Sequence, residues 1–279
     1  MSDVPPICIA KTPTTMRPFA IRRIVKRRGE SLPLHLHPEA QLTFAASGMV
    51  QVHTEEGVWF VPPQIAAWMP PEVPHRLDLI TDAELWLVMW HASAIAEWAP
   101  KGFPDRPFAL RITPLLRCLL ADAVANTPAP GKTELLLRLM LHEMTAMANA
   151  PTFLPLPTSD AGRRVADLAL GDRRNRMGLD ELAERAATSV RTASRLFPQE
   201  TGMTLKAWRQ RARIVSAIGA LSDGRSIADV ADRAGFSSTA AFCCAFRQVM
   251  GVTPTAFLQG PGQAAAQQRA LPTHADAVS

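Results

Sequence analysis

Hydrophobic and polar positions follow two different periods along the chain. Between Phe19 and His91 the apolar residues form short runs, which glycines and prolines interrupt. Such runs are typical of β-strands, and many short strands at regular spacing favour a small barrel or sandwich. After Trp98 the apolar residues recur at helical spacing, first over Thr113–Asn126 and then over Thr133–Asn149. We therefore predict a β-barrel and a hairpin of two helices, which either caps the barrel or pairs with a second copy of the protein.

The pattern changes again after a proline-rich segment, Ala150–Asp160, which we expect to be an extended spacer. Two later segments, Leu179–Gly202 and Ile227–Gly251, each combine an alanine-punctuated apolar helix, a short turn with serine and a second helix. One such helix-turn-helix is common by chance. Two of them joined by one long helix, Thr204–Leu221, can reach two successive turns of DNA, roughly 34 Å apart.

Composition narrows the class of protein. A chain of 279 residues with 47% hydrophobic and 20% charged residues fits a soluble protein of two domains. No stretch approaches the roughly 18 uninterrupted apolar residues of a membrane span, and the N-terminus has no pattern of a secretory signal. The four cysteines form no CxxC pair and no zinc-like spacing. We expect a cytoplasmic protein with reduced thiols and no membrane partner.

The distribution of charge matters more than its total of +5. Residues 1–159 carry 14 basic and 14 acidic side chains, whereas residues 160–260 carry 15 basic and 10 acidic side chains. A basic region attached to a neutral one points to a polyanionic partner for the basic region only.

Each predicted helix-turn-helix ends in a helix with one outward face. In the first unit that face presents Arg191, Ser194 and Arg195 at positions i, i+3 and i+4. Arginine can bond guanine O6 and N7 together, so we expect Arg191 and Arg195 to read bases. The corresponding face of the second unit offers fewer bidentate donors, and we expect it to hold phosphates and contact thymine methyl groups. Its residues are Thr239, Ala240, Cys243, Cys244 and Arg247.

The arginines of the helix between the units have two interpretations. They contact backbone phosphates or form a solvated face, and Arg209 is the best candidate for a phosphate contact.

The arrangement over about residues 160–258 resembles the AraC/XylS family of transcription regulators. Order, spacing and identities agree in both halves, and the residues that carry the resemblance are Leu182, Ala183, Ser189, Arg195, Leu196, Phe197, Glu200, Thr201, Gly202, Trp208, Arg209, Arg213, Ile227, Ala228, Ala231, Gly235, Phe236, Phe242, Ala245, Phe246, Arg247, Gly251, Val252, Thr253 and Pro254. The resemblance implies that both units insert into adjacent major-groove segments on one face of DNA.

Two departures from the family pattern affect these expectations. Pro198 stands where a helix former is usual, and because it lacks an N–H we expect it to shorten or bend the first reading helix near its end. Cys243 and Cys244 stand where polar residues are more common, which puts base contact there in doubt.

A second constellation lies in the predicted barrel. His35 and His37 point to one face of a strand, and His75 comes from a later strand, so three imidazoles can meet one ion or ligand. The segments around them resemble the paired motifs of cupin barrels, in which three histidines and a glutamate hold a divalent metal. Here Gln41 replaces that glutamate and Glu72 stands where glycine is usual, and the loss of a carboxylate should weaken a site for hard ions.

Three interpretations of this constellation stay open. His35, His37 and His75 bind a divalent metal, they line a metal-free effector pocket together with Gln41, or they are structural. No other cofactor is expected.

These observations predict a sequence-specific transcription regulator of AraC type, which a small molecule or metal in the barrel controls. The expected partners are double-stranded promoter DNA, the effector, RNA polymerase and a second copy of the chain. The alternative is a metal-dependent cupin enzyme with a DNA-binding domain; we predict no enzyme, because Gln41 removes the usual carboxylate and no acid–base partner is evident. A third alternative is an architectural DNA-binding protein without effector control.

The predicted fold class is α+β with two domains, a cupin-like barrel with a helical hairpin and an all-α domain. The predicted divisions are a flexible arm over 1–16, the effector-binding barrel over 17–100, the dimerising hairpin over 101–150, a linker over 151–159, the DNA-binding domain over 160–260 with helix-turn-helix units at 179–200 and 227–250, and a disordered tail over 261–279.

Overall fold

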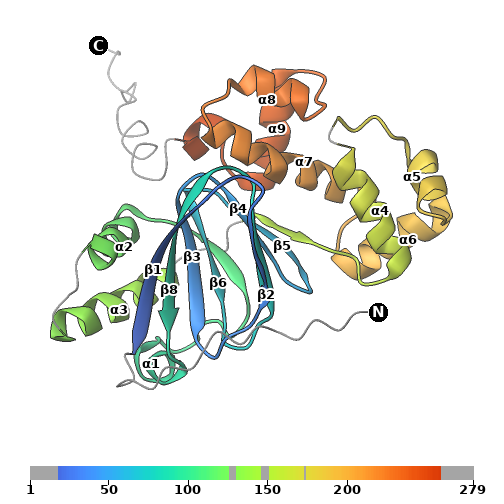
Figure 1. Ribbon diagram of the computed structural model, residues 1–279. Helices are drawn as coiled ribbons and strands as arrows, with labels where there is room; N and C mark the ends of the chain where they lie inside the picture. Colours follow the sequence, from blue (N-terminus) through green and yellow to red (C-terminus); the bar gives the residue numbers. More distant parts are fainter. Residues whose placement is uncertain (1–17, 126–129, 146–150, 173, 259–279) are drawn as a thin grey trace, which may run out of the picture.

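The computed structural model describes residues 18–125, 130–145, 151–172 and 174–258, and the predicted arm and tail lie outside them. Within these ranges ten strands form two antiparallel sheets of five, and helices cover both (Figure 1). The first sheet has the order β1 (Phe19–Lys26), β8 (Ala83–Trp90), β3 (Ala40–Ser47), β6 (Ile65–Met69) and β9 (Phe108–Arg111). The second has the order β10 (Phe153–Pro155), β5 (Gly57–Val61), β4 (Val50–His53), β7 (His75–Leu79) and β2 (Ser31–His35).

The predicted α+β class with a sheet domain followed by a helical domain is confirmed, but the sheet domain is not a closed barrel. Among the described strands no hydrogen-bonded ladder joins the two sheets, so each keeps its own edges. Each sheet can therefore have other parts of the protein packed against both of its faces. The second sheet is covered on both faces in this way. Every residue of β5 is buried, which is typical of a strand with protein on both faces.

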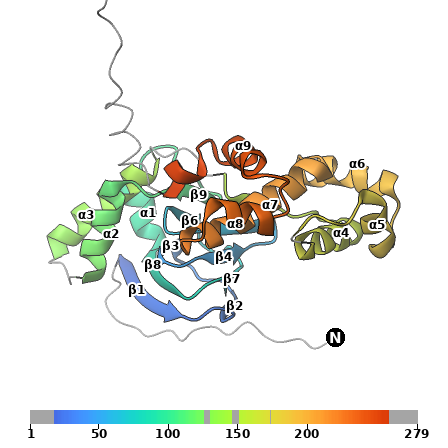
Figure 2. The ribbon, with the colours of Figure 1, turned by 90° about the horizontal axis from the view of Figure 1, so that it is seen from above.

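Helices α1 (Ala92–Trp98), α2 (Pro114–Ala125) and α3 (Pro130–Thr145) lie beside the first sheet (Figures 1 and 2). Leucines and methionines of α2 and α3 form one core cluster with the outer face of that sheet. The predicted hairpin therefore caps the sheet domain.

The helical domain contains six helices among the described residues, and five have a side-chain N-cap that accepts the backbone N–H three residues on. The caps are Ser159, Ser189, Thr204, Ser226 and Ser238. The helices are α4 (Asp160–Gly171), α5 (Leu179–Arg185), α6 (Val190–Thr201), α7 (Leu205–Ser222), α8 (Ile227–Arg233) and α9 (Thr239–Met250). None of the described helices is long and apolar enough to cross a lipid bilayer.

The segment expected to be a free spacer is partly a strand. Residues 153–155 form β10, which pairs with β5 at the edge of the second sheet. Trp208 of α7 donates an indole N–H to the carbonyl of Pro155 over 2.6 Å, so the strand holds α7 against the sheet domain. The proline pattern indicated an extended backbone, but only the tertiary structure supplied the strand that it pairs with.

Two further contacts join the domains. Arg111 of β9 donates to the carbonyl of Met250 at the end of α9 over 3.1 Å, and its guanidinium lies 5.8 Å from the centre of the Phe257 ring. Gly219 brings α7 close to the sheet domain, because a Cβ at this position would lie 2.9 Å from the Met49 Cε atom. Nothing in the sequence marked Arg111 for this role.

Candidate DNA-reading helices and histidine pocket

The first reading helix, α6, presents the face that the sequence predicts. Its N-cap, Ser189, accepts the backbone N–H of Thr192 over 3.0 Å, and Gly202 ends it in the left-handed conformation. The residues expected to contact DNA are all exposed on this helix, and they are Arg191, Ser194 and Arg195. On the opposite face Phe197 is buried, with its ring centre 5.3 Å from that of Trp208. Packing of that face against α7 therefore leaves the arginine-bearing face to the solvent.

Pro198 does not shorten this helix, so that part of the prediction is wrong, while a bend at the proline stays a prediction. The helix continues to Thr201, three residues beyond the proline. Proline removes the hydrogen bond to the carbonyl of Ser194, but Ser194 is exposed and water can bond to its carbonyl. One turn later Thr201 Oγ1 donates to the carbonyl of Phe197 over 2.6 Å, which supports the last turn.

The second reading helix, α9, is built in the same way. Ser238 caps it, and Gly251 ends it in the left-handed conformation. Four of the expected outward residues are exposed, and they are Thr239, Ala240, Cys244 and Arg247. Cys243 differs from the expectation, because it is partly buried and packs against the core of the domain. A side chain held there has less reach towards a DNA groove.

Arg209 is not a free phosphate contact, which corrects the prediction. Its guanidinium lies 3.0 Å from the carboxylate of Asp172 and donates to the carbonyl of Met177 over 3.0 Å. The side chains of Arg209 and Asp172 are only 14% and 7% exposed. Binding a phosphate would require Arg209 to leave a nearly buried carboxylate, which is strongly unfavourable.

The other arginines of α7 also bind backbone carbonyls. Arg213 donates to the carbonyls of Ala234 and Gly235 and stacks over the Phe236 ring at 4.2 Å, while Arg211 donates to the carbonyl of Pro151. Neither of the predicted interpretations, phosphate contact or solvated face, describes these residues. A long side chain with five donors can satisfy loop carbonyls that the sequence does not reveal as neighbours.

The three predicted histidines meet between the sheets. His35 lies at the end of β2, directly opposite His75 at the start of β7, and the centres of their rings are 4.5 Å apart. The ring of His37 lies 5.7 Å from His35 and 5.2 Å from His75. Each residue offers one ring nitrogen, and these three atoms lie within 4.8 Å of one another. The antiparallel register of β2 and β7 thus brings together residues about forty positions apart in the sequence.

One hydrogen-bond pattern repeats at all three histidines. The Nδ1 atoms lie 2.7, 2.7 and 2.8 Å from the backbone carbonyls of Pro33, Glu39 and Val73. A carbonyl only accepts, so each Nδ1 carries the proton and each neutral ring keeps a lone pair on Nε2. Anchoring of the second ring nitrogen in this way is typical of histidines that bind metals.

Gln41 completes the pocket from β3. It is buried, its amide group donates to Thr43 Oγ1 over 2.9 Å, and its Oε1 atom lies 3.1 Å from His37 Nε2. The amide nitrogen of Gln41 also lies 3.4 Å from His75 Nε2, so the amide contacts two of the three imidazoles. The donor set of three imidazoles and one amide oxygen therefore fits a divalent transition-metal ion.

Burial keeps the deepest histidine neutral. His75 has no exposed surface, and desolvation lowers its pKa to about 4, while the hydrogen bond with Val73 opposes this shift. Its neighbours His35 and His37 lower the pKa further. The Nε2 lone pair of His75 is consequently available throughout the neutral range.

The loop that leads to His75 contains the residue that stands in place of glycine. Glu72 adopts a positive φ of 61°, and its backbone N–H donates to the carbonyl of His37 over 3.0 Å. This bond joins the two histidine segments. A side chain is unfavourable at this φ, so the loop holds its conformation at some cost in stability.

Known families and proteins resemble both parts of the chain. The AraC-like ligand binding domain model matches residues 18–141, and a helix-turn-helix domain model matches residues 182–260, so together they match well over half of the chain. The HTH-type transcriptional regulator NimR of Escherichia coli is 29% identical over 229 residues, which are 81% of this chain and 82% of that protein. The HTH-type transcriptional regulator RipA of Corynebacterium glutamicum is 35% identical over 106 residues, which are 38% of this chain and 32% of that protein.

The comparison with solved structures gives a weak likeness. The crystal structure of ToxT from Vibrio cholerae with a bound unsaturated fatty acid covers 88% of this chain and 97% of its own, with 11% identity and a TM-score of 0.39. The matches to the ligand-binding model and the helix-turn-helix model agree with the two domains and the paired reading helices described above. The chain therefore belongs to the AraC family of transcriptional regulators, with an N-terminal ligand-binding domain and a C-terminal DNA-binding domain of helix-turn-helix type.

Proposed function

We propose that the protein reads a specific promoter sequence with α6 and α9, and that a divalent transition-metal ion bound by His35, His37 and His75 is its effector. The observation that carries the effector assignment is the convergence of three imidazoles whose Nδ1 atoms are all anchored to backbone carbonyls.

The DNA half of the proposal is supported by charge and geometry. Both reading helices are exposed, and the single helix α7 of 18 residues joins their units. At 1.5 Å per residue, α7 is about 27 Å long, which suits two units that enter successive major-groove segments. The net charge of +5 over residues 160–260 favours a polyanion.

Selection of bound duplexes from a random library tests this half. We expect a bipartite site whose two halves are about one helical turn apart, with an affinity that falls steeply as salt rises. Recovery of no preferred sequence, or of a single half-site only, would contradict the use of both units.

A bound metal would hold β2, the segment after it and β7 together, because His35 ends β2, His37 follows it and His75 begins β7. Imidazole ligands suit zinc, nickel, copper and iron, and the neutral Gln41 makes the site less suited to hard ions.

Calorimetric titration of metal-depleted protein with Zn²⁺ and Ni²⁺ tests the effector assignment. We expect one ion per chain, and a loss of binding of at least tenfold in His35→Ala. The matched control is His142→Ala, which removes an exposed histidine of α3 and should leave metal affinity unchanged. Equal metal binding by both variants would contradict the assignment, and substrate turnover by the loaded protein would favour the enzyme alternative.

Metal control of DNA binding is a separate readout. We expect His35→Ala to retain the DNA affinity of the metal-free protein and to lose its response to metal. An unfolded sheet domain in this variant would mean that the histidine is structural.

We also propose that the hairpin of α2 and α3 pairs with a second copy of the chain. It exposes three leucines, Leu115, Leu135 and Leu139, at 46%, 71% and 41%, although it already caps the first sheet. Sedimentation of Leu135→Asp should show a monomer, whereas Val25→Asp, which changes an equally exposed residue of β1, should not alter the assembly. Contact with RNA polymerase remains a prediction from the family resemblance.

A further inference from the structure

The loop between α4 and α5 touches both helix-turn-helix units. Its residues 174–178 lead directly into α5, the first helix of the first unit. They also pack against the second unit, because a Cβ on Gly235, in the turn between α8 and α9, would overlap the backbone carbonyl of Arg174. We call residues 174–178 the interunit loop.

Two side chains outside the interunit loop hold its backbone in one shape. The Asp172 carboxylate accepts the backbone N–H groups of Arg176 and Met177 over 2.9 and 2.8 Å. Arg209 donates to the same carboxylate and to the carbonyl of Met177, each over 3.0 Å. Asn175 adopts a positive φ of 53°, which asparagine tolerates better than most residues. Arg209 therefore builds this loop, although it does not present a free charge itself.

Two arginine side chains of the interunit loop are exposed, and they are Arg174 and Arg176. Arg174 lies 4.0 Å from the carboxylate of Asp232, and these side chains are 55% and 80% exposed. An ion pair that is so open to water contributes little, so a phosphate can replace Asp232 at small cost. Within the described part of the chain Arg176 has no ion pair. Both guanidinium groups are thus available to an anionic partner.

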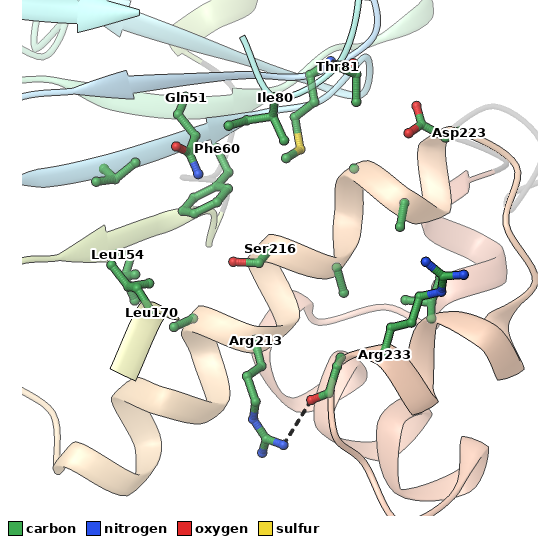
Figure 3. A pocket seen from close by; sticks show the side chains of 18 of the residues that line it. Gln51, Phe60, Ile80, Thr81, Leu154, Leu170, Arg213, Ser216, Asp223 and Arg233 are labelled. Atoms are coloured by element: carbon green, nitrogen blue, oxygen red, sulfur yellow. Dashed lines mark hydrogen bonds between the residues drawn. The ribbon is translucent and has the colours of Figure 1, made fainter. Parts of the chain in front are cut away.

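The sheet domain does not take up these two arginines. An interdomain cavity of about 560 Å³ lies between the second sheet and helices α7 and α8 (Figure 3). Asp172, Arg213 and Ala234 line it, and Figure 3 shows the bond that Arg213 donates to the turn of the second unit. Among the described residues that line this cavity, neither Arg174 nor Arg176 is included. The anchors of the interunit loop therefore face the sheet domain, whereas its arginines do not.

The position of the interunit loop suits contact with the DNA backbone. In a helix-turn-helix unit the second helix enters the major groove, and the first helix crosses the sugar–phosphate backbone. The interunit loop leads into α5, a first helix, and touches the turn that leads into α9, a second helix. When α6 and α9 occupy successive major-groove segments, the backbone that separates these segments passes between the two units. The interunit loop lies between the same two units.

We propose that Arg174 and Arg176 bind DNA phosphates between the two major-groove segments and so fix the position of both units on DNA. This inference rests on the DNA reading by α6 and α9 that is proposed above. Arginine bonds to phosphate through two parallel N–H groups, and such contacts orient a protein without reading sequence. A loop that is already held in one shape loses little conformational entropy when it binds.

The salt dependence of binding to the duplex selected by the wild type tests the proposal. Each phosphate contact contributes about 0.9 to the slope of log affinity against log salt concentration. Arg174→Ala combined with Arg176→Ala should reduce this slope by about two and weaken binding to selected and unrelated duplexes alike. The loss of affinity between about 50 and 200 mM salt should then be roughly tenfold smaller than in the wild type.

Matched variants separate a local contact from a change in net charge. Arg22→Ala combined with Arg27→Ala removes two exposed arginines of the sheet domain and should leave the slope almost unchanged. Arg174→Lys combined with Arg176→Lys keeps both charges and should retain most of the slope. An unchanged slope in the alanine variant of the interunit loop, or an equal reduction in the variant of the sheet domain, would overturn the proposal. A loss of preference at a single base pair would instead assign these arginines to base reading.

Ethylation of single phosphates locates the contacts and needs only the wild type and the alanine variant. We expect ethylation between the two half-sites to block binding of the wild type. The alanine variant should be insensitive to it there and remain sensitive within the half-sites. Interference confined to the half-sites of the wild type would overturn the proposal and leave DNA reading by α6 and α9 intact. Recovery of no bound duplex at all would contradict the proposed DNA reading as well.

Discussion

The two helix-turn-helix units share one local design but have different surroundings. In both, a serine caps the reading helix and a glycine in the left-handed conformation ends it. Figures 1 and 2 both show α5 and α6 extending away from the sheets, whereas α8 and α9 lie over them. Arg111 of the sheet domain binds the last turn of α9, and α8 lines the interdomain cavity.

This difference suggests a division of labour. The first unit carries the arginine-bearing face and contacts the linker through Glu200 rather than the sheets. The second unit is poorer in base-reading side chains but is tied to the ligand-binding domain. We infer that the first unit supplies most of the sequence discrimination and that effectors act chiefly on the position of the second.

The largest expected effect on stability concerns Arg209 and Arg213, the two arginines of α7 that bind the two units. Arg209 binds the loop before the first unit through Asp172, while Arg213 binds the second unit through two carbonyls and the Phe236 ring, without a carboxylate. Arg209→Ala leaves a nearly buried carboxylate without its cation and should lower the free energy of unfolding by about 3 kcal/mol. Arg213→Ala should lower it by about 1–2 kcal/mol. Chemical denaturation measures both, and equal losses would remove this asymmetry.

The glycines of the second unit should differ in cost. Gly235 has a φ of 70°, and a Cβ there would overlap the backbone of Arg174. We expect Gly235→Ala to destabilise the helical domain by about 2–3 kcal/mol. Gly251→Ala, at a φ of 73° with open space around it, should cost about 1 kcal/mol. If Gly235→Ala and Gly251→Ala lower the midpoint of thermal unfolding equally, contact with the loop before the first unit does not constrain Gly235.

DNA affinity should separate the reading faces directly. Arg195→Ala should weaken binding by about 1–3 kcal/mol and relax the preference at one base pair. Arg247→Ala should weaken binding to all sequences alike. It should also reduce the number of counterions that DNA releases on binding by about one. Binding curves on the selected site and on single-base variants make the comparison, and a uniform loss for Arg195→Ala would assign that residue to phosphate.

The smallest effects should be equal in the two units. Ser189→Ala and Ser238→Ala each remove one N-cap acceptor and should each cost about 1 kcal/mol of stability. Unfolding measured by circular dichroism checks this. A much larger cost in one unit would mean that the caps are not equivalent after all.

Local patterns explain why much of the site could be predicted. Arg191, Ser194 and Arg195 share a face because a helix repeats every 3.6 residues, and that face is exposed as expected. Strand alternation was expected to bring His35 and His37 to one face; β2 ends at His35 and His37 lies two residues beyond it, yet both rings meet His75. Serine caps and the glycines at helix ends also act within one turn, so they depend on local sequence alone.

The sequence by itself determined the two domains, the pair of reading helices and the three histidines, since periodicity, caps and short motifs act over a few residues. Only the tertiary structure decided that the sheets stay separate, that residues 153–155 form a strand, and that Arg209 is bound to Asp172. It also created the cavity, which exists only where α7 meets the second sheet. The physical reason is that these features depend on groups far apart in the chain, whose contact is set by packing.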